Sequence, residues 1–538
     1  MLTSSCSRLL VCLMHAALLM VLCTGFTGAQ TPDSLAARID RVMSRPEFRH
    51  ANFGIEFYSL DTGKVVYALN ADKMFVPAST TKLLTEGAVL AKLGADYRFQ
   101  TRIYRSGPLD SKGRLKGDLV LVASGDPNLS NRILPDGTLA FVDEDHSYNG
   151  PAVPGDPLTV IKQLAKDVSS KGVRRIEGRV LVDASLVPDG AREGGTNVVM
   201  SSIMVNDNVI DVTVTPGAKA GDRAAIATSP QTSYVKFSGQ VLTSSSSGKA
   251  SLDTSDPIVN ADGTTSVLIT GTIPAGAPAE TLAVGVLSPT NFAQTVLREA
   301  LAANGISIKP PKKTDPPIFP TYLKFYVPEN LLAEHTSLPL SEEVKVTLKV
   351  SQNLHAGMGP YLLGALAAKN ARDLRQAGFG MEQQFLQEAK LDMSGISQGD
   401  GEGGDWADLF SPDFMVQYLK YWTKRPEYPV FFKALPILGR DGTLAKIQTA
   451  SPGAGYVFAK TGTFGSEDRV NGKVMLNGKG LAGYVITAKG EKLAFAAYVN
   501  HVSLPPDPDA PQSVAGQALG EIAAAAYDAR FEPIANGN

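Results

Sequence analysis

The chain has 538 residues, with 51 Lys and Arg side chains against 53 Asp and Glu side chains. A chain of this length exceeds what one hydrophobic core usually holds, so we expect two or more domains. The near-neutral charge excludes a general electrostatic attraction to nucleic acid or to an anionic membrane surface.

Residues 1–29 have the pattern of a secretory signal peptide. Arg8 precedes a short apolar run, and the small residues Thr27 and Ala29 follow it, so we expect cleavage after Ala29. The alternative, an uncleaved membrane anchor, is disfavoured because the apolar run is short for a bilayer span. All three cysteines lie in this segment, so the mature protein has no thiol for a nucleophile, a metal site or a disulfide.

Helix and strand patterns alternate in the segment that follows. Apolar residues in 33–43 have helical spacing. The runs 52–60 and 65–72 predict two strands of a hairpin. The next helical pattern opens at Ser79, and Gly94 can end it.

From about residue 98 to residue 320 the pattern becomes mostly β-type, which indicates an inserted domain. Short strand-like runs are found at 119–124, 178–185, 208–216, 233–239 and 266–273. One helix is expected at 289–303, and the proline-rich stretch 310–320 predicts a stiff linker at a domain boundary.

Beyond this linker the helical pattern returns, at 341–357 and 361–370. Residues 481–502 predict two strands around a tight turn, and 513–528 predict a closing helix. Both ends of the chain are therefore expected to build one domain, which the β-rich segment interrupts.

The stretch PASTTKLLT places Ser79 three residues before Lys82 at a predicted helix start. In a helix this spacing stacks the lysine one turn above the serine. The helix N-terminus adds partial positive charge and free N–H groups, which favour an oxyanion and a deprotonated amine. The alternative reading is a serine N-cap followed by a surface lysine.

Two later motifs favour the catalytic reading. SQN at 351–353 follows a helical pattern, and KTG at 460–462 opens the run KTGTFGS. The order Ser79, Ser351, Lys460 is that of the penicillin-recognising serine enzymes, which carry S-x-x-K, then S-D-N, then K-T-G. The middle motif here is Ser-Gln-Asn, so only its first and third residues match.

With these motifs the chain resembles the low-molecular-mass class C penicillin-binding proteins, the D-alanyl-D-alanine carboxypeptidase/endopeptidases of peptidase family S13. The resemblance covers nearly the whole mature chain and includes SGDPNLS (124–130) and LPILGRDGTL (435–444). One departure is LDMSGISQ (391–398), where relatives usually show D-G-S-G-L-S-R. Met393 and Gln398 therefore put some substrate contacts in doubt, but not the core chemistry.

The resemblance implies an α+β fold: a penicillin-binding transpeptidase-like, β-lactamase-like domain with an antiparallel sheet and helices. We expect residues 30–97 and 321–538 to form this domain. Residues 98–320 are then the β-rich insertion, which is long in this family.

The resemblance also implies roles for the motif residues. Ser79 attacks the carbonyl of a terminal D-Ala-D-Ala peptide, and Lys82 takes its proton. A neighbouring Lys460 would depress the pKa of Lys82, because like charges disfavour the ammonium. Ser351 passes the proton to the leaving D-alanine nitrogen, and Asn353 orients Lys82 and binds the substrate amide.

The third motif would bind the far end of the substrate. Lys460 and Thr461 are expected to bind the terminal carboxylate, and Gly462 lets the substrate backbone approach closely. The backbone N–H groups of Ser79 and Thr463 would form the oxyanion hole.

The expected substrates are peptidoglycan stem peptides, with β-lactam antibiotics as inhibitors and the periplasm or cell envelope as location. No nucleic-acid partner, cofactor or metal is expected, since the histidines form no metal-binding spacing. Weak membrane association and the oligomeric state stay open. The alternatives are a β-lactamase or esterase of the same fold, and a non-catalytic cell-wall binding protein.

Two smaller expectations concern polar residues outside the motifs. Ser147-Tyr148-Asn149 also fits Ser-x-Asn, but its acidic, Gly- and Pro-rich surroundings predict a surface loop. His355 is expected to pack or to face solvent rather than to bind substrate.

Overall fold

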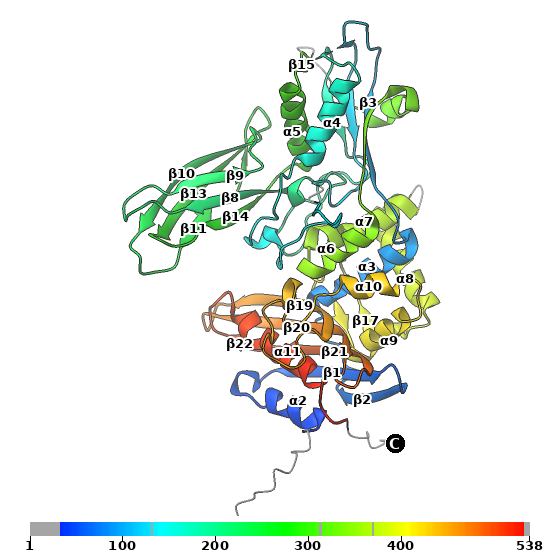
Figure 1. Ribbon diagram of the computed structural model, residues 1–538, viewed down its shortest axis with the longest axis vertical. Helices are drawn as coiled ribbons and strands as arrows, with labels where there is room; N and C mark the ends of the chain where they lie inside the picture. The colour runs from blue at the N-terminus through cyan, green and yellow to red at the C-terminus, as the bar shows by residue number, and fades with distance from the viewer. Residues whose placement is uncertain (1–32, 131–132, 311–314, 368–370, 532–538) are drawn as a thin grey trace, which may run out of the picture.

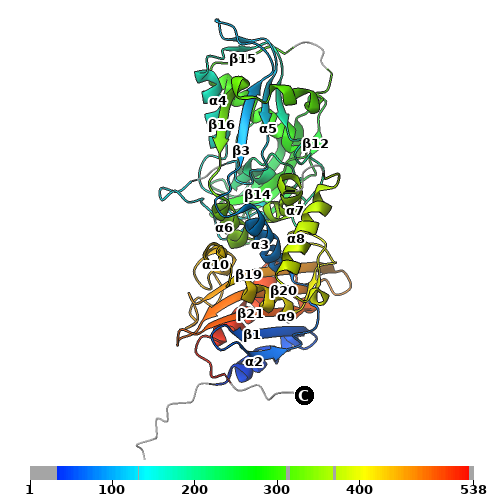
Figure 2. The ribbon, with the colours of Figure 1, turned by 90° about the vertical axis from the view of Figure 1, so that its right-hand side faces the viewer.

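The computed structural model describes residues 33–130, 133–310, 315–367 and 371–531. The predicted signal peptide lies outside these residues. Figures 1 and 2 show an elongated molecule whose lower half is built from both ends of the chain and whose upper half is built from the segment between them. In the described ranges, none of the helices combines the length and the apolar character needed to span a membrane.

A six-stranded sheet forms the centre of the lower half. Its strands are β1 (Asn52–Ser59), β2 (Lys64–Leu69), β19 (Val457–Asp468), β20 (Lys473–Ile486), β21 (Lys492–Asn500) and β22 (Val502–Leu504). They run antiparallel in the order β19-β20-β21-β1-β2, and β22 pairs with β20. Because β1 pairs with β21, the first hairpin of the chain joins strands from its end.

Helices cover both faces of this sheet because alternate side chains of its strands point to opposite sides. On β21, Phe495 belongs to the core beneath α2 (Leu35–Met43) and α11 (Gln517–Ala525), whereas Tyr498 belongs to the opposite core. The opposite core also contains side chains of α3 (Lys82–Leu93), α6 (Leu340–Val350), α7 (Asn353–Ala367), α8 (Leu374–Glu388), α9 (Pro412–Trp422) and α10 (Tyr428–Ala434). Figure 2 shows α3, α6, α7, α8 and α10 between the sheet and the upper half, and α9 beside the sheet.

The upper half has its own core around a four-stranded sheet and two helices. The sheet has the order β16 (Leu331–Thr336), β3 (Gln100–Arg105), β5 (Leu119–Val122), β7 (Val180–Asp183), and the helices are α4 (Thr159–Ser170) and α5 (Pro289–Ala303). Helix α4 has no counterpart among the predicted elements. The predicted boundary at residue 320 stays a prediction, and β16 returns to the upper sheet after it.

Two further small sheets form the lobe on the left of Figure 1. One has the order β14 (Glu280–Gly285), β8 (Val209–Thr215), β9 (Ala225–Ser229). The other has the order β10 (Val235–Ser244), β13 (Thr265–Pro274), β11 (Ser251–Thr254), with β12 (Ile258–Val259) paired to β13. The remaining strands are short: β15 (Ser307–Ile308), β6 (Arg175–Ile176) and β4 (Arg114–Leu115) form a three-stranded sheet in that order, and β17 (Ile396–Ser397) pairs with β18 (Leu409–Phe410).

Candidate active site

Ser79 lies in a single 3₁₀ turn, η2 (Ala78–Thr81), just before α3 rather than at a helix N-cap. Ala78 is fully buried and has a left-handed φ of +48°, an unusual conformation for a residue with a Cβ. A Cβ on Gly403 would lie 2.1 Å from the Ala78 carbonyl oxygen, and one on Gly462 would lie 3.0 Å from Ser79 N. Gly462 therefore lets the strained turn that carries Ser79 pack closely against it, which a side chain at this position would hinder.

Lys82 begins α3 and is completely buried. Its Nζ lies 2.8 Å from Ser79 Oγ, 2.6 Å from Asn353 Oδ1 and 2.8 Å from the Glu402 carbonyl oxygen. Asn353 begins α7 and donates through Nδ2 to the Tyr148 hydroxyl at 2.5 Å. This second contact of the amide group turns its oxygen towards the lysine.

The charge state of Lys82 reflects two opposing effects. Burial lowers its pKa to about 8, while nearby carboxylates, foremost those of Glu402 and Asp400, act to raise it. A lysine that titrates near this value is partly neutral at mildly alkaline pH, so it can accept a proton.

Ser351 caps the C-terminus of α6 with a left-handed φ of +66°, between α6 and α7. Lys460 on β19 is completely buried, and its Nζ lies 2.8 Å from Ser351 Oγ and 2.8 Å from the Thr461 carbonyl oxygen. Burial, and then the charges of Lys82 and Lys479, lower the pKa of Lys460 well below its usual value. The two predicted lysines therefore each contact one of the two predicted serines.

A third lysine, Lys479 on β20, was not predicted. It is paired in register with Thr463 of β19, and its Nζ lies 2.6 Å from Thr463 Oγ1 and 2.8 Å from Gln512 Oε1. Burial lowers the pKa of Lys479 to about 7. On β19, Thr461 Oγ1 donates to Thr443 Oγ1 at 2.8 Å. No local spacing in the sequence marks Lys479, because only strand pairing places it beside the third motif.

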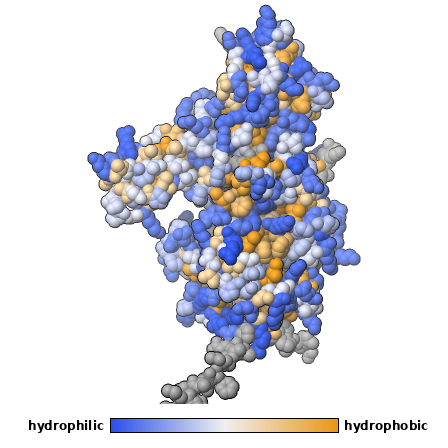
Figure 3. Space-filling model, in the orientation of Figure 1, coloured by the Kyte–Doolittle hydropathy of each residue, from blue (hydrophilic) through white to orange (hydrophobic). Residues whose placement is uncertain are grey.

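These residues enclose a cavity of about 410 Å³. The predicted residues that line it are Ser79, Ser351, Asn353, Thr461, Gly462 and Thr463, and further lining residues include Tyr148, Thr443, Lys479 and Gln512. Lys82 and Lys460 lie directly behind the two serines. The structure thus brings all eight predicted site residues together from three distant parts of the chain. On the face drawn in Figure 3, hydrophobic residues gather around the middle of the molecule, where its two halves meet.

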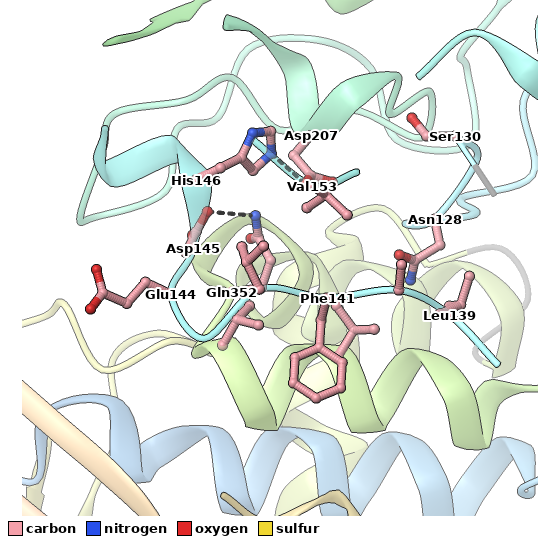
Figure 4. A pocket seen from close by; sticks show the side chains of 14 residues that line it. Asn128, Ser130, Leu139, Phe141, Glu144, Asp145, His146, Val153, Asp207 and Gln352 are labelled. Carbon is pink, nitrogen blue, oxygen red and sulfur yellow. Dashed lines mark hydrogen bonds and ion pairs between the residues drawn. The ribbon is translucent and has the colours of Figure 1, made fainter. Parts of the chain in front are cut away.

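The segment predicted as a surface loop is exposed at Tyr148 and Asn149, but it also forms one wall of this cavity, which was not predicted. Asp145 is buried and accepts a hydrogen bond from Gln352 Nε2 at 3.2 Å, as Figure 4 shows, and Tyr148 contacts Asn353. This segment is held in place because the buried Asp145 side chain binds buried partners such as Gln352. Local composition does not reveal such partners, because Gln352 is distant in sequence.

His355 is buried in a network of charged groups that links the upper half to α6 and α7. Its ring lies 2.9 Å from Asp207 and 3.0 Å from Glu343, and His146 lies 2.7 Å from Asp207 and 2.8 Å from Asp211. Figure 4 shows His146 and Asp207 facing each other beside the Asp145 wall. Within the described ranges, no group of three or more His, Cys, Asp or Glu side chains is arranged to hold a metal ion.

Comparison with solved structures defines the class of fold. The chain matches the crystal structure of penicillin binding protein 4 (dacB) from Haemophilus influenzae with a TM-score of 0.67 and 21% identity, over 90% of this chain and 97% of that chain. A second structure of that protein, complexed with a β-lactam, matches with a TM-score of 0.63. The predicted α+β, penicillin-binding fold is confirmed.

The particular family follows from the sequence comparison. The model of the D-Ala-D-Ala carboxypeptidase 3 (S13) family matches residues 35–518, and the chain belongs to this family. A D-alanyl-D-alanine carboxypeptidase of Actinomadura sp. strain R39 is 28% identical over 517 residues, which cover 92% of this chain and 86% of that protein. D-alanyl-D-alanine carboxypeptidase DacB of Haemophilus influenzae is 24% identical over 475 residues, 84% of this chain and 86% of that protein. The prediction of a serine-type carboxypeptidase of family S13 is confirmed.

Proposed function

We propose that this chain is an exported enzyme that cleaves the D-Ala-D-Ala ends or the cross-links of peptidoglycan stem peptides through an acyl-enzyme on Ser79. Penicillin would acylate the same serine. The observation that carries the proposal is the contact of Lys82 Nζ with both Ser79 Oγ and Asn353 Oδ1 at one end of a cavity that also holds the KTG strand.

In the proposed acylation, Ser79 Oγ attacks the carbonyl carbon of the penultimate D-alanine while its proton passes to Lys82. The N–H groups of Ser79 and Thr463 bind the developing oxyanion. Ser351 donates its proton to the departing D-alanine nitrogen and recovers one from Lys460, whose Nζ lies 2.8 Å from its oxygen. Water then attacks the ester and gives up a proton, which restores Lys460 through Ser351, while Lys82 returns its proton to the departing Ser79 Oγ.

Lys479 supports recognition of a free terminal carboxylate. Its ammonium donates to Thr463 Oγ1, so the Thr463 hydroxyl hydrogen is free to point into the cavity. No carboxylate is bonded to Lys479 among the described residues, since its two side-chain partners are Thr463 and Gln512. A substrate carboxylate would supply the missing negative charge.

The cell-envelope location and the predicted division into 30–97 plus 321–538 and 98–320 belong to this proposal. The location agrees with a substrate that lies outside the cytoplasmic membrane.

The proposal is tested by incubating the purified protein with labelled penicillin, followed by denaturing electrophoresis. Wild type should be labelled and Ser79→Ala should not, whereas Ser394→Ala, on an exposed turn, should be labelled like wild type. An unlabelled wild type contradicts the proposal. Rapid turnover of the antibiotic, with no stable adduct, would instead favour the β-lactamase or esterase alternative. Binding of peptidoglycan without release of D-alanine would favour a non-catalytic cell-wall binding protein.

A further inference from the structure

The turn at residues 400–404, with the sequence DGEGG, lies outside the three motifs. It closely follows Gln398, one of the positions where this chain departs from the usual D-G-S-G-L-S-R. Asp400 is only 8% exposed and Glu402 only 4% exposed, although both are charged residues in a glycine-rich stretch. Charged side chains that are buried in this way need partners, and these partners reveal what the turn does.

Asp400 binds the backbone of the turn at three successive positions. Its carboxylate accepts N–H groups from Glu402 at 3.0 Å, from Gly403 at 2.6 Å and from Gly404 at 2.9 Å. A single charged acceptor that holds three successive backbone donors leaves the turn little conformational freedom.

The backbone held in this way faces the catalytic helix. The Gly401 carbonyl accepts a hydrogen bond from Thr85 Oγ1 at 2.8 Å, one turn of α3 beyond Lys82. The next carbonyl, that of Glu402, lies 2.8 Å from Lys82 Nζ. Gly403 packs against the backbone of the strained turn that carries Ser79. Three successive residues of turn 400–404 therefore contact the base, its helix and the turn of the nucleophile.

A neutral lysine amine has two hydrogens and one lone pair. Two of the three contacts of Lys82 Nζ, the Asn353 Oδ1 atom and the Glu402 carbonyl oxygen, can only accept hydrogen bonds. When both amine hydrogens are donated to them, the lone pair is left for the third contact, Ser79 Oγ at 2.8 Å. This is the orientation in which the amine can receive the proton of the serine.

We propose that Asp400 is a positioning residue for the reaction: by fixing turn 400–404 it holds the Glu402 carbonyl on Lys82 and so directs the lysine lone pair to Ser79. The inference rests on the proposed roles of Ser79 as nucleophile and Lys82 as base. It adds to them a residue from outside the three motifs.

Asp400 also acts on Lys82 through its charge, and this effect has the opposite sign. The charged or titratable groups that act on Lys82 are Glu402, Asp400, Glu193, Asp145, Lys460 and Glu86. The carboxylates among them favour the ammonium form, so removing the charge of Asp400 moves the titration of Lys82 to lower pH. Loss of the fixed position of the Glu402 carbonyl should slow the reaction. Loss of the negative charge of Asp400 should instead extend the reaction to lower pH, so the two effects can be measured separately.

The experiment compares wild type with Asp400→Asn, Glu402→Gln and Asp405→Asn in the whole protein. The rate constant for acylation by a fluorescent penicillin is measured from about pH 6 to about pH 10, and thermal melting checks the fold. Asn at position 400 keeps one acceptor but loses the charge and the bond to Gly404. We expect its rate constant to fall at least about tenfold, with the acid limb of the profile displaced to lower pH.

Glu402→Gln keeps the backbone carbonyl and an acceptor for the Gly194 N–H, which the Glu402 side chain binds at 2.9 Å. It therefore removes charge alone, so the acid limb should move to lower pH with a smaller loss of rate than in Asp400→Asn. Asp405 lies on the same loop but is exposed, and Asp405→Asn should match wild type.

An Asp400→Asn protein with the rate and pH profile of wild type overturns the positioning role and leaves the proposed function intact. If Asp400→Asn does not fold, Thr85→Val takes its place, because it removes the hydrogen bond that holds the Gly401 carbonyl of the same turn against α3. An acylation rate constant equal to that of wild type would then overturn the inference. A wild type that penicillin does not acylate removes the proposed function itself.

Discussion

The two ends of the catalytic cavity hold buried lysines in opposite electrostatic surroundings. Around Lys82 the carboxylates of Glu402 and Asp400 counteract burial, and its pKa stays at about 8. Around Lys460 the neighbouring charges that shift its pKa are the cations Lys82 and Lys479, and these add to the effect of burial. In the proposed function, one residue type would thus act as a titratable base at one end and help to bind the substrate carboxylate at the other.

This difference explains how one small cavity can both receive a proton and bind a negative charge. The base must be able to lose its proton near neutral pH and to take one up again. Burial lowers the pKa of Lys82, and the nearby carboxylates partly offset this effect, so both protonation states are accessible. The anion site needs positive charge that no protein carboxylate neutralises, so that a substrate carboxylate can pair with it. The predictions below test the two ends separately, from the largest expected effect to the smallest.

Removing the amine at the base end should have the largest effect. Lys82→Met keeps much of the buried apolar volume but leaves Ser79 without a proton acceptor, so acylation by penicillin should fall at least about a thousandfold. Stopped-flow fluorescence measures this rate. Lys92→Met, at the half-buried C-terminal end of the same helix, serves as the control and should keep most of the activity. A Lys82→Met protein that acylates at more than about a tenth of the wild-type rate would contradict the assignment of the base.

At the anion end, Lys479→Met should raise KM for a D-Ala-D-Ala peptide with a free carboxylate by about tenfold or more, with a smaller change in kcat. The matched substrate is the same peptide with its terminal carboxylate amidated, for which the variant and wild type should be alike. Lys479→Arg should retain most of the discrimination, because it keeps the positive charge. An equal loss on both peptides would show that Lys479 does not recognise the carboxylate.

The pH dependence of kcat/KM should distinguish the two ends in a single profile. Activity rises as Lys82 loses its proton, with a pKa of about 8, and falls as Lys479 loses its own, with a pKa of about 7. The optimum should therefore be narrow and lie between these values. In Lys479→Arg the alkaline limb should disappear because arginine stays charged, and the acid limb should move up to the pKa of Lys82, about 8. An alkaline limb unchanged in this variant would have to come from another group.

The smallest effect is expected from Tyr148→Phe. This change removes the hydroxyl that binds Asn353 Nδ2 but leaves the ring in the cavity wall. The amide keeps its bond to Lys82, so acylation should slow only about threefold to tenfold. Asn353→Ala should cost more, because it removes that bond as well. The comparison is made on acylation rates at a single pH, and equal losses in the two variants would contradict this ranking.

Much of the fold was predictable because its signals are local. The helix at 289–303 and the strands of the first hairpin have regular apolar periodicity and turn residues at their ends. Helix α4 was missed because Thr159, Val160 and Ile161 are β-branched residues, which local propensity assigns to strands. Burial of its apolar face against the upper core overrides that preference.

By itself, the sequence determined the three motifs, their order and the family, because these depend on residue identity and spacing along the chain. The tertiary structure decided which groups surround each lysine, since Glu402, Asp400 and Lys479 come close to Lys82 or Lys460 only through folding of distant segments. It also decided that the acidic segment around Asp145 is a wall of the site rather than a free loop. Electrostatic effects act through space over a few ångströms, so the proton affinity of each lysine depends on neighbours that a linear pattern does not contain.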